Sequence, residues 1–268
     1  MIRRILFRFR AFFILSSSIV LLTLGLSVML FPFQEIEELR TGYFIVHPKG
    51  KNLPAEYEIV KSRPKKWVKL ESISPAAYRA IMLSEDFRFY KHYGIDFLQI
   101  KHSLIGSKKL GRARSLSQQL ANSLFINNDK TFFRKIMEVP MAIYLDWRLP
   151  KKKILEAYLN SIKFGDQVYG IADASRVYYD KLPSTLSMRE GANLAILLSD
   201  PEHSSLLFQQ ENLSIYTDKL VFRIMKRMVQ AGFITEGQFE SQTGKTYAWE
   251  DQDEDEFEWP SLAREVSN

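Results

Sequence analysis

Two adjacent acids open the stretch EDFRFYKHYG, which covers residues 85–94. Glu85 and Asp86 follow an apolar run and precede an aromatic patch that ends with His92 and Gly94. The helix macrodipole disfavours acids at a helix C-terminus, so their presence here indicates a role. A carboxylate in such a place can take a proton from a hydroxyl nucleophile. The alternative is an ordinary solvated helix end.

The histidine in this stretch also has two interpretations. His92 could ligate a metal, but the chain holds only four histidines and none of the others stands at ligand spacing from it. A structural, hydrogen-bonding histidine is therefore the preferred interpretation.

Cysteine is absent, which excludes a thiolate nucleophile, a disulfide framework and a Cys-ligated zinc.

The elements that must position these residues are mostly helical. Ser74 and Pro75 are typical of an N-cap and a first helical position, and the helix that they begin delivers the two acids at its end. Apolar residues spaced three and four apart predict further helices in LSQQLANSLFI, FRKIMEVPMAIYLDW, KKKILEAYLNSIKF, GIADASRVYYDK, SMREGANLAILLS and TDKLVFRIMKRMVQAG. Gly232 is predicted to end the last of these, and Thr235 to begin a short one. The predicted fold class is mainly α.

The N-terminus predicts a membrane anchor. Residues 11–34 contain no charged side chain, and about 20 apolar residues are enough to cross a bilayer core. Residues 1–10 carry four arginines and no acid, which predicts a cytoplasmic N-terminus and an extracytoplasmic, periplasmic domain. We expect an uncleaved single-pass anchor in the cytoplasmic (inner) membrane rather than a signal peptide, because no clean cleavage site follows.

The remainder divides into three predicted parts. Residues 35–65 form a linker with short extended pieces, residues 66–246 form the globular domain, and residues 247–268 form an acidic tail. The tail has eight acids against one arginine, so a chain of net charge +6 must have a strongly basic body. A basic domain beside a membrane favours an anionic partner such as phospholipid head groups or a phosphorylated lipid. Nucleic acid is not expected as a partner outside the cytoplasm.

Five motifs, in order, resemble those of the peptidoglycan glycosyltransferases (glycosyltransferase family 51). This family includes the monofunctional biosynthetic transglycosylases and the N-terminal domain of class A penicillin-binding proteins. The matching positions are Glu85, Asp86, Phe89, His92 and Gly94, then Gln118 and Gln119, then Arg134, Lys135 and Glu138, and finally Glu156, Tyr158 and Asn160 in ILEAYLNSIKFG. The segments YGIADASRVYYDK and LSMREGANLAILLSDP match later parts of the family. The resemblance covers approximately residues 66–240.

The resemblance implies a lysozyme-like helical glycosyltransferase domain behind one transmembrane helix. It implies an enzyme that polymerises lipid II into glycan chains by inverting transfer, with release of undecaprenyl pyrophosphate. Glu85 would accept the proton of the attacking hydroxyl. Glu138 matches the family's second acid, placed to bind a divalent cation or to position the donor. The sequence requires no cofactor, and Mg²⁺ or Mn²⁺ at Glu138 is the cation that we consider.

The resemblance also implies substrate-binding residues around the leaving group, whose negative charge calls for cations or a metal. The implied set is Asp86, Phe89, Arg112, Arg114, Ser115, Gln118, Gln119, Lys130, Arg134 and Lys135. Tyr158 and Asn160 are expected to maintain the fold. Expected partners are lipid II, the growing glycan strand, membrane phospholipid and a transpeptidase or other divisome or elongation proteins.

The second motif departs from the family pattern. Arg112 stands where the family has glycine, Arg114 stands in place of a serine, and Asn122 stands in place of a lysine. We expect the two arginines to supply the lost positive charge, since arginine binds phosphate well. In the third motif, Pro140 removes a helical hydrogen bond at a cost of about 3 kcal/mol unless a kink absorbs it, and is expected to displace Glu138.

Two other functions stay open at this stage. The first is a membrane-anchored scaffold that binds lipid II or glycan but has lost turnover, which the loss of lysine at Asn122 favours. The second is a lytic enzyme of the lysozyme type, for which only isolated acids match. The presence of both Glu85 and Glu138 favours the polymerase.

Overall fold

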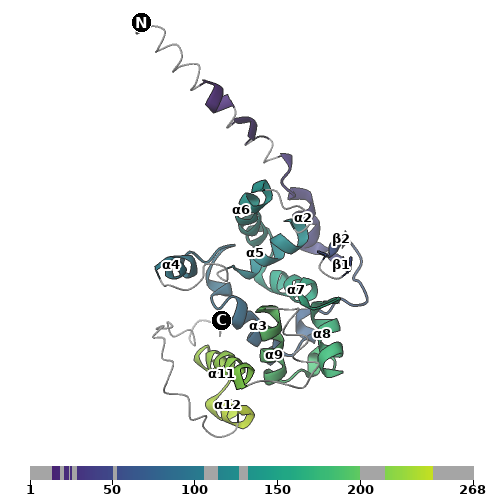
Figure 1. Ribbon diagram of the computed structural model, residues 1–268. Helices are drawn as coiled ribbons and strands as arrows, with labels where there is room; N and C mark the ends of the chain where they lie inside the picture. Colours follow the sequence, from purple (N-terminus) through teal and green to yellow (C-terminus); the bar gives the residue numbers. More distant parts are fainter. Residues whose placement is uncertain are drawn as a thin grey trace.

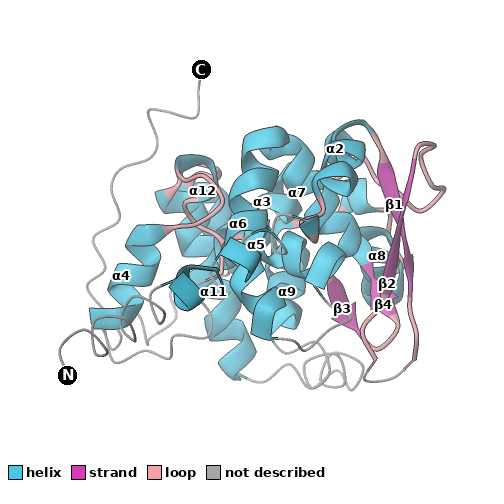
Figure 2. Cartoon of the chain, turned by 90° about the horizontal axis from the view of Figure 1, so that it is seen from above, coloured by secondary structure: helices cyan, strands magenta, loops and turns pink. Residues whose placement is uncertain are grey.

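The structure is a computed structural model, and it describes residues 14–18, 21–23, 25, 29–50, 53–105, 114–126, 132–199 and 215–243. The described residues are mainly helical, as predicted, with short antiparallel strand pairs at one side (Figures 1 and 2). The helices are α2 (Phe33–Thr41), α3 (Pro75–Glu85), α4 (Phe97–Ile105), α5 (Leu116–Ala121), α6 (Phe132–Arg148), α7 (Lys151–Ser161), α8 (Gly170–Tyr179), α9 (Met188–Ser199), α11 (Ile215–Gln230) and α12 (Glu236–Thr243). Short helical turns are η1 (Leu70–Ser72), η2 (Phe89–Lys91), the π-turn η4 (Asn122–Ile126) and η5 (Pro183–Thr185), and the strands are β1 (Tyr43–His47), β2 (Glu56–Val60), β3 (Lys163–Gly165) and β4 (Val168–Tyr169).

The predicted anchor over residues 11–34 falls partly outside the described residues. Within the part that is described, no helix has both the length and the apolar character that a bilayer crossing requires. The basic segment 1–10 and the acidic tail 247–268 also lie outside the described residues.

The helix that follows the predicted anchor is docked on the domain. In α2, Ile36 and Leu39 are fully buried, and Glu37 forms an ion pair with Arg148 at the end of α6. Tyr144 of α6 donates a second hydrogen bond to Glu37 at 3.3 Å. The hydrogen bond from Arg148 is the main cause that holds the pKa of the Glu37 carboxyl below its ordinary value. Figure 1 shows α2 beside α6, so this ion pair fixes where the N-terminal segment leaves the domain.

The segment expected to be a linker contains an ordered hairpin. Strands β1 and β2 pair antiparallel, with Tyr43 opposite Val60. Phe44 is 2% exposed and its ring packs edge-on against Trp67, with centroids 4.9 Å apart. The hairpin is therefore part of the packed domain, because its alternating apolar residues have a core to cover.

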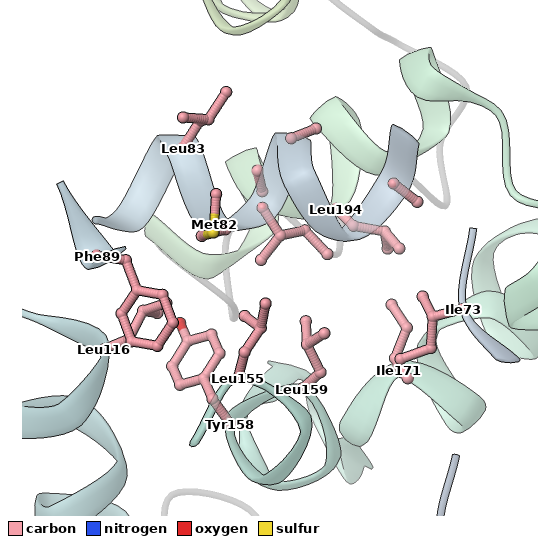
Figure 3. Close-up of a cluster of buried hydrophobic side chains, with 14 of the residues drawn as sticks. Ile73, Met82, Leu83, Phe89, Leu116, Leu155, Tyr158, Leu159, Ile171 and Leu194 are labelled. Carbon is pink, nitrogen blue, oxygen red and sulfur yellow. The ribbon is translucent and has the colours of Figure 1, made fainter. Parts of the chain in front are cut away.

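The centre of the core lies between α3, α7 and α9. Leu155, Tyr158 and Leu159 of α7 are fully buried. Figure 3 shows Leu155 and Leu159 pointing to the α3–α9 layer and Tyr158 lying toward Phe89 and Leu116. Helix α9 approaches α3 very closely at Gly191, where an added Cβ would lie 2.4 Å from the Cα of Ala77. Full burial of a leucine side chain contributes about 1.5–3 kcal/mol, so this layer holds α3 and its C-terminal end firmly in place.

The C-terminal helices end and begin as predicted. Gly232 has φ of +71° just after α11, a conformation that glycine adopts without strain. Thr235 caps α12, with its hydroxyl accepting from the backbone N–H of Gln238 and the Gln238 side chain accepting from the Thr235 N–H. This reciprocal pair is a capping box.

Candidate active site

Glu85 is the last residue of α3, and a side-chain amide binds its carboxylate. Nε2 of Gln119, from α5, donates a hydrogen bond to Oε2 of Glu85 at 3.0 Å. Glu85 is half-buried, so the carboxylate is reachable from solvent while one oxygen is held. A carboxylate oriented in this way can accept a proton from a hydroxyl that reaches it. The predicted helix therefore ends at Glu85, and the role of Glu85 as proton acceptor stays a prediction.

A buried tyrosine orients the amide. The hydroxyl of Tyr158, from α7, donates to Oε1 of Gln119 at 3.2 Å, which leaves Nε2 to face Glu85. Burial raises the pKa of Tyr158 well above its usual value, and the nearby negative charges of Glu85 and Asp86 raise it further. The phenol therefore stays protonated and remains a donor. Tyr158 was expected only to maintain the fold; in addition, it positions Gln119.

Asp86, next to Glu85, is turned into the protein. Its side chain is 0% exposed and accepts from the backbone N–H of Leu116 at 2.9 Å, at the first turn of α5. Both of its oxygens lie 2.9 Å from Nε2 of His92. The preferred interpretation of His92 as a hydrogen-bonding residue is thus confirmed. Asp86 fixes α5 relative to α3 and presents no surface to a substrate, which departs from the predicted binding role.

Phe89 also departs from its predicted role in binding. The ring is fully buried between α5 and α7, near Leu116 and Tyr158 (Figure 3). The ammonium of Lys151 lies 4.4 Å from the ring centroid. Removing this apolar ring from water lowers the free energy of the folded state. Phe89 therefore stabilises the core beneath the site.

Ser115 and Gln118 cap α5. The Ser115 hydroxyl accepts from the N–H of Gln118 at 3.1 Å and donates to the carbonyl of Gly94, while Oε1 of Gln118 accepts from the N–H of Ser115 at 3.0 Å. Ser115 is 1% exposed and Gln118 is 7% exposed. These hydrogen bonds use the groups that were expected to contact sugar or phosphate. Of the polar pair Gln118 and Gln119, only the second contacts a predicted catalytic acid.

Gly94 shows why the first motif ends in glycine. Its φ is +70°, and an added Cβ would lie 2.6 Å from the backbone of Ile143 in α6. Its N–H donates to Asp146 of α6 and its carbonyl accepts from Ser115. The loop after Glu85 is thereby fastened to both α6 and α5, because only glycine permits this approach.

The second predicted acid lies in an ion pair. Oε2 of Glu138, on α6, is 3.2 Å from Nη2 of Arg114, and the two side chains are 8% and 50% exposed. The carbonyl of Arg114 also accepts from Nε2 of Gln119 at 3.4 Å. Gln119 and Arg114 therefore link the surroundings of Glu85 to those of Glu138. Helix α6 runs unbroken past Pro140, and Glu138 faces inward.

The remaining predicted residues are placed only in part. Arg112 and Lys130 lie outside the described residues. Arg134 and Lys135 are in the first turn of α6, four and three residues before Glu138, and their side chains are not described. Asn122 begins the π-turn that follows α5.

The described surroundings of Glu138 place a cationic side chain, and no cluster of acids, beside the carboxylate. Mg²⁺ and Ca²⁺ take several oxygen ligands. The described part of the chain has no group of three or more His, Asp or Glu side chains that could hold a metal ion. The Glu138 carboxylate instead has the guanidinium of Arg114 beside it.

Sequence reasoning missed how the fourth motif acts. Glu156 accepts from Nε1 of Trp67 at 2.8 Å and from the N–H of Leu70 at 2.9 Å. Asn160 binds both the N–H and the carbonyl of Val68, at 2.9 and 2.8 Å. Residues 67–70 are thus clamped onto α7. The expectation that Asn160 maintains the fold is confirmed. Polar residues on the otherwise apolar stripe of α7 were the feature of the sequence that could have indicated these contacts.

Comparisons with known proteins agree with this geometry. Residues 51–228 match the model of a family described as Transglycosylase. The biosynthetic peptidoglycan transglycosylase of Rhizobium meliloti (strain 1021) is 32% identical over 183 residues, which cover 66% of this chain and 75% of that protein. The enzyme of the same name from Haemophilus influenzae (strain ATCC 51907 / DSM 11121 / KW20 / Rd) is 35% identical, covering 62% and 68%. Penicillin-binding protein 1A of Escherichia coli (strain K12) is 34% identical, over 65% of this chain and 20% of that protein.

Proposed function

Because this chain belongs to the transglycosylase family and is a glycosyltransferase, we propose that it polymerises the glycan chains of peptidoglycan from lipid II. The names of its relatives support peptidoglycan as the product. The observation that carries the proposal is the hydrogen bond from Gln119 to Glu85, beside the Arg114–Glu138 pair. Gln119 binds the Glu85 carboxylate and also the backbone of Arg114, whose guanidinium pairs with Glu138. Transfer from a lipid pyrophosphate needs a proton acceptor and a cation, and these residues supply both.

In the proposed reaction, Glu85 is the general base. The 4-hydroxyl of the acceptor sugar gives its proton to the Glu85 carboxylate as its oxygen forms a bond to C1 of the donor sugar. The bond from C1 to the pyrophosphate oxygen breaks, and its electron pair leaves with undecaprenyl pyrophosphate. Attack from the face opposite the leaving group inverts C1. Gln119 and Tyr158 hold the base in place, and positioning of this kind accounts for a large part of enzymatic rate.

The leaving pyrophosphate is stabilised by arginine and lysine side chains in this proposal. Arg114 is the described candidate, because half of its side chain is exposed beside Glu138. Arg112, Lys130, Arg134 and Lys135 are proposed from their positions in the sequence. Arginine offers a planar fork of N–H groups that suits phosphate oxygens.

The proposed setting is the outer face of the cytoplasmic membrane. Residues 11–34 would anchor the chain in this membrane. The domain would have a lysozyme-like arrangement of helices and would lie outside, at the phospholipid surface. A lipid-linked substrate is confined to the same surface, which raises its local concentration. A transpeptidase is a proposed partner, since penicillin-binding protein 1A is among the relatives.

The test is polymer formation by the full chain in detergent with purified lipid II. Wild-type protein is expected to produce glycan, and Glu85→Gln is expected to lower the rate by about 10³-fold or more, since the amide is not a base at neutral pH. Glu71→Gln removes an exposed acid on η1 and is the matched control, expected to keep full activity. An inactive wild type that still binds lipid II would establish the scaffold function instead. Activity that survives Glu85→Gln would exclude Glu85 as the base.

A further inference from the structure

The Arg114–Glu138 pair combines a nearly buried acid with a half-exposed cation. Glu138 is 8% exposed, and Nη2 of Arg114 lies 3.2 Å from its Oε2. A carboxylate that has lost most of its water needs a compensating charge, because burial of an unpaired ion costs several kcal/mol. Arg114 supplies that charge from the residue just before the α5 cap.

Arg114 is also held on its main-chain side. Its carbonyl accepts from Nε2 of Gln119, and the Ser115 capping box fixes the following residue. These contacts fix where the Arg114 side chain leaves the backbone, and the ion pair places its guanidinium beside Glu138. Its five N–H donors exceed what one carboxylate takes up, and the 50% exposure leaves some of them open to a ligand.

We infer that Arg114 occupies the role of a divalent cation at Glu138, so that this chain needs no metal ion there. One consequence of this inference rests on the proposed function. The guanidinium that neutralises Glu138 also contacts the leaving pyrophosphate. The inference follows from the ion pair, which holds a guanidinium against the carboxylate oxygen that a metal ion would have to bind. Arginine remains charged at any working pH, so it serves as a permanent positive charge.

The first experiment measures Mn²⁺ binding by electron paramagnetic resonance of the full chain in detergent, without turnover. In the wild-type background, Glu138→Gln is expected to leave Mn²⁺ affinity unchanged, because Arg114 keeps the metal away. In an Arg114→Ser background, Glu138→Gln is expected to weaken Mn²⁺ binding about tenfold or more, because the Arg114 guanidinium no longer competes with the metal for the carboxylate. A loss of affinity in the wild-type background, or no loss in the Arg114→Ser background, would overturn the inference.

The second experiment measures glycan polymerisation with EDTA or with added Mn²⁺. The wild-type rate is expected to differ by less than about twofold between the two conditions, whereas Arg114→Ser is expected to lose about tenfold in EDTA and to recover with Mn²⁺. Arg114→Lys keeps the charge and is expected to stay resistant to EDTA. Arg189→Ser removes an arginine paired with Asp218, between α9 and α11, and is the control expected to behave as wild type.

The two experiments separate the two proposals. If the wild type makes no polymer in either condition, the proposed function fails, and Mn²⁺ binding alone decides the role of Arg114. If the wild type makes polymer only with Mn²⁺, the role of Arg114 fails and the proposed function stands.

Discussion

The amide of Gln119 is held between Tyr158 and Glu85, accepting from the phenol at 3.2 Å and donating to the carboxylate at 3.0 Å. The three residues come from α7, α5 and α3 and meet only in the folded chain. Because folding already orders the Glu85 side chain, this side chain loses little conformational entropy when the substrate binds.

The first prediction concerns the charge next to the base. Gln119→Glu places a second carboxylate against Glu85, and two like charges in contact raise the pKa of one of them. The acidic limb of the pH profile of kcat/KM is expected to move upward by about one pH unit.

Gln238→Glu is the control for this variant, because it adds the same charge at a distant cap on α12. Its acidic limb is expected to stay where the wild-type limb lies. An unmoved limb in Gln119→Glu would show that Glu85 is not the group that titrates in catalysis.

The second prediction concerns alkaline stability. Burial raises the pKa of Tyr158 in the folded chain above its unfolded value near 10, so the folded state favours the neutral phenol. That preference is fully present below pH 10 and is lost as the pH rises toward the folded pKa. The unfolding free energy is therefore expected to fall above pH 10.

Tyr158→Phe is expected to make that fall shallower, as measured by urea unfolding from pH 8 to about pH 11. Some slope remains, because burial also raises the pKa of Tyr57 and Tyr179. The variant is also expected to lower kcat about 3–10-fold with little change in KM, since Gln119 loses its orienting partner. An unchanged alkaline slope would contradict the burial argument.

The third prediction concerns the glycine that fastens the first motif to α6. Gly94→Ala forces a positive φ on alanine and puts its Cβ within 2.6 Å of the Ile143 backbone. The expected loss of unfolding free energy is about 2–5 kcal/mol. Gly237→Ala is the matched control: its Cβ would meet nothing within 4 Å, and alanine suits α12. This control is expected to be unchanged or more stable by up to about 1 kcal/mol. Equal effects of the two substitutions would contradict the packing argument.

The fourth prediction concerns the clamp on residues 67–70. Asn160→Ala removes the side chain that binds both backbone groups of Val68, and Asn160 is 8% exposed. The expected cost is about 1–3 kcal/mol in thermal or urea unfolding, because the part-buried N–H and carbonyl of Val68 lose their partner. Gln34→Ala removes an exposed amide that binds Glu38, and a change within about 0.5 kcal/mol is expected. A small effect at Asn160 would mean that water replaces the clamp.

Some features of the fold could be predicted because they depend on neighbours in sequence. The start of α3 at Pro75, the end of α11 at Gly232 and the cap at Thr235 all follow from local backbone preferences. The local rule at Pro140 is different, because α6 is continuous there in spite of the proline; that Pro140 displaces Glu138 from its position in the family stays a prediction. Packing of the amphipathic helix outweighs the single lost hydrogen bond.

The sequence by itself determined the mainly α fold, the pair of acids and the excess of positive charge around the second motif. These properties lie in residue type and periodicity, which tertiary contacts do not alter. Only the tertiary structure decided that Asp86 and Phe89 lie inside while Glu85 stays accessible. It also decided that Arg114 belongs to Glu138, and that Gln119 joins residues 34 and 39 positions away in the chain. Such choices depend on which side chains burial brings together, and a buried polar group must find its partner among those neighbours.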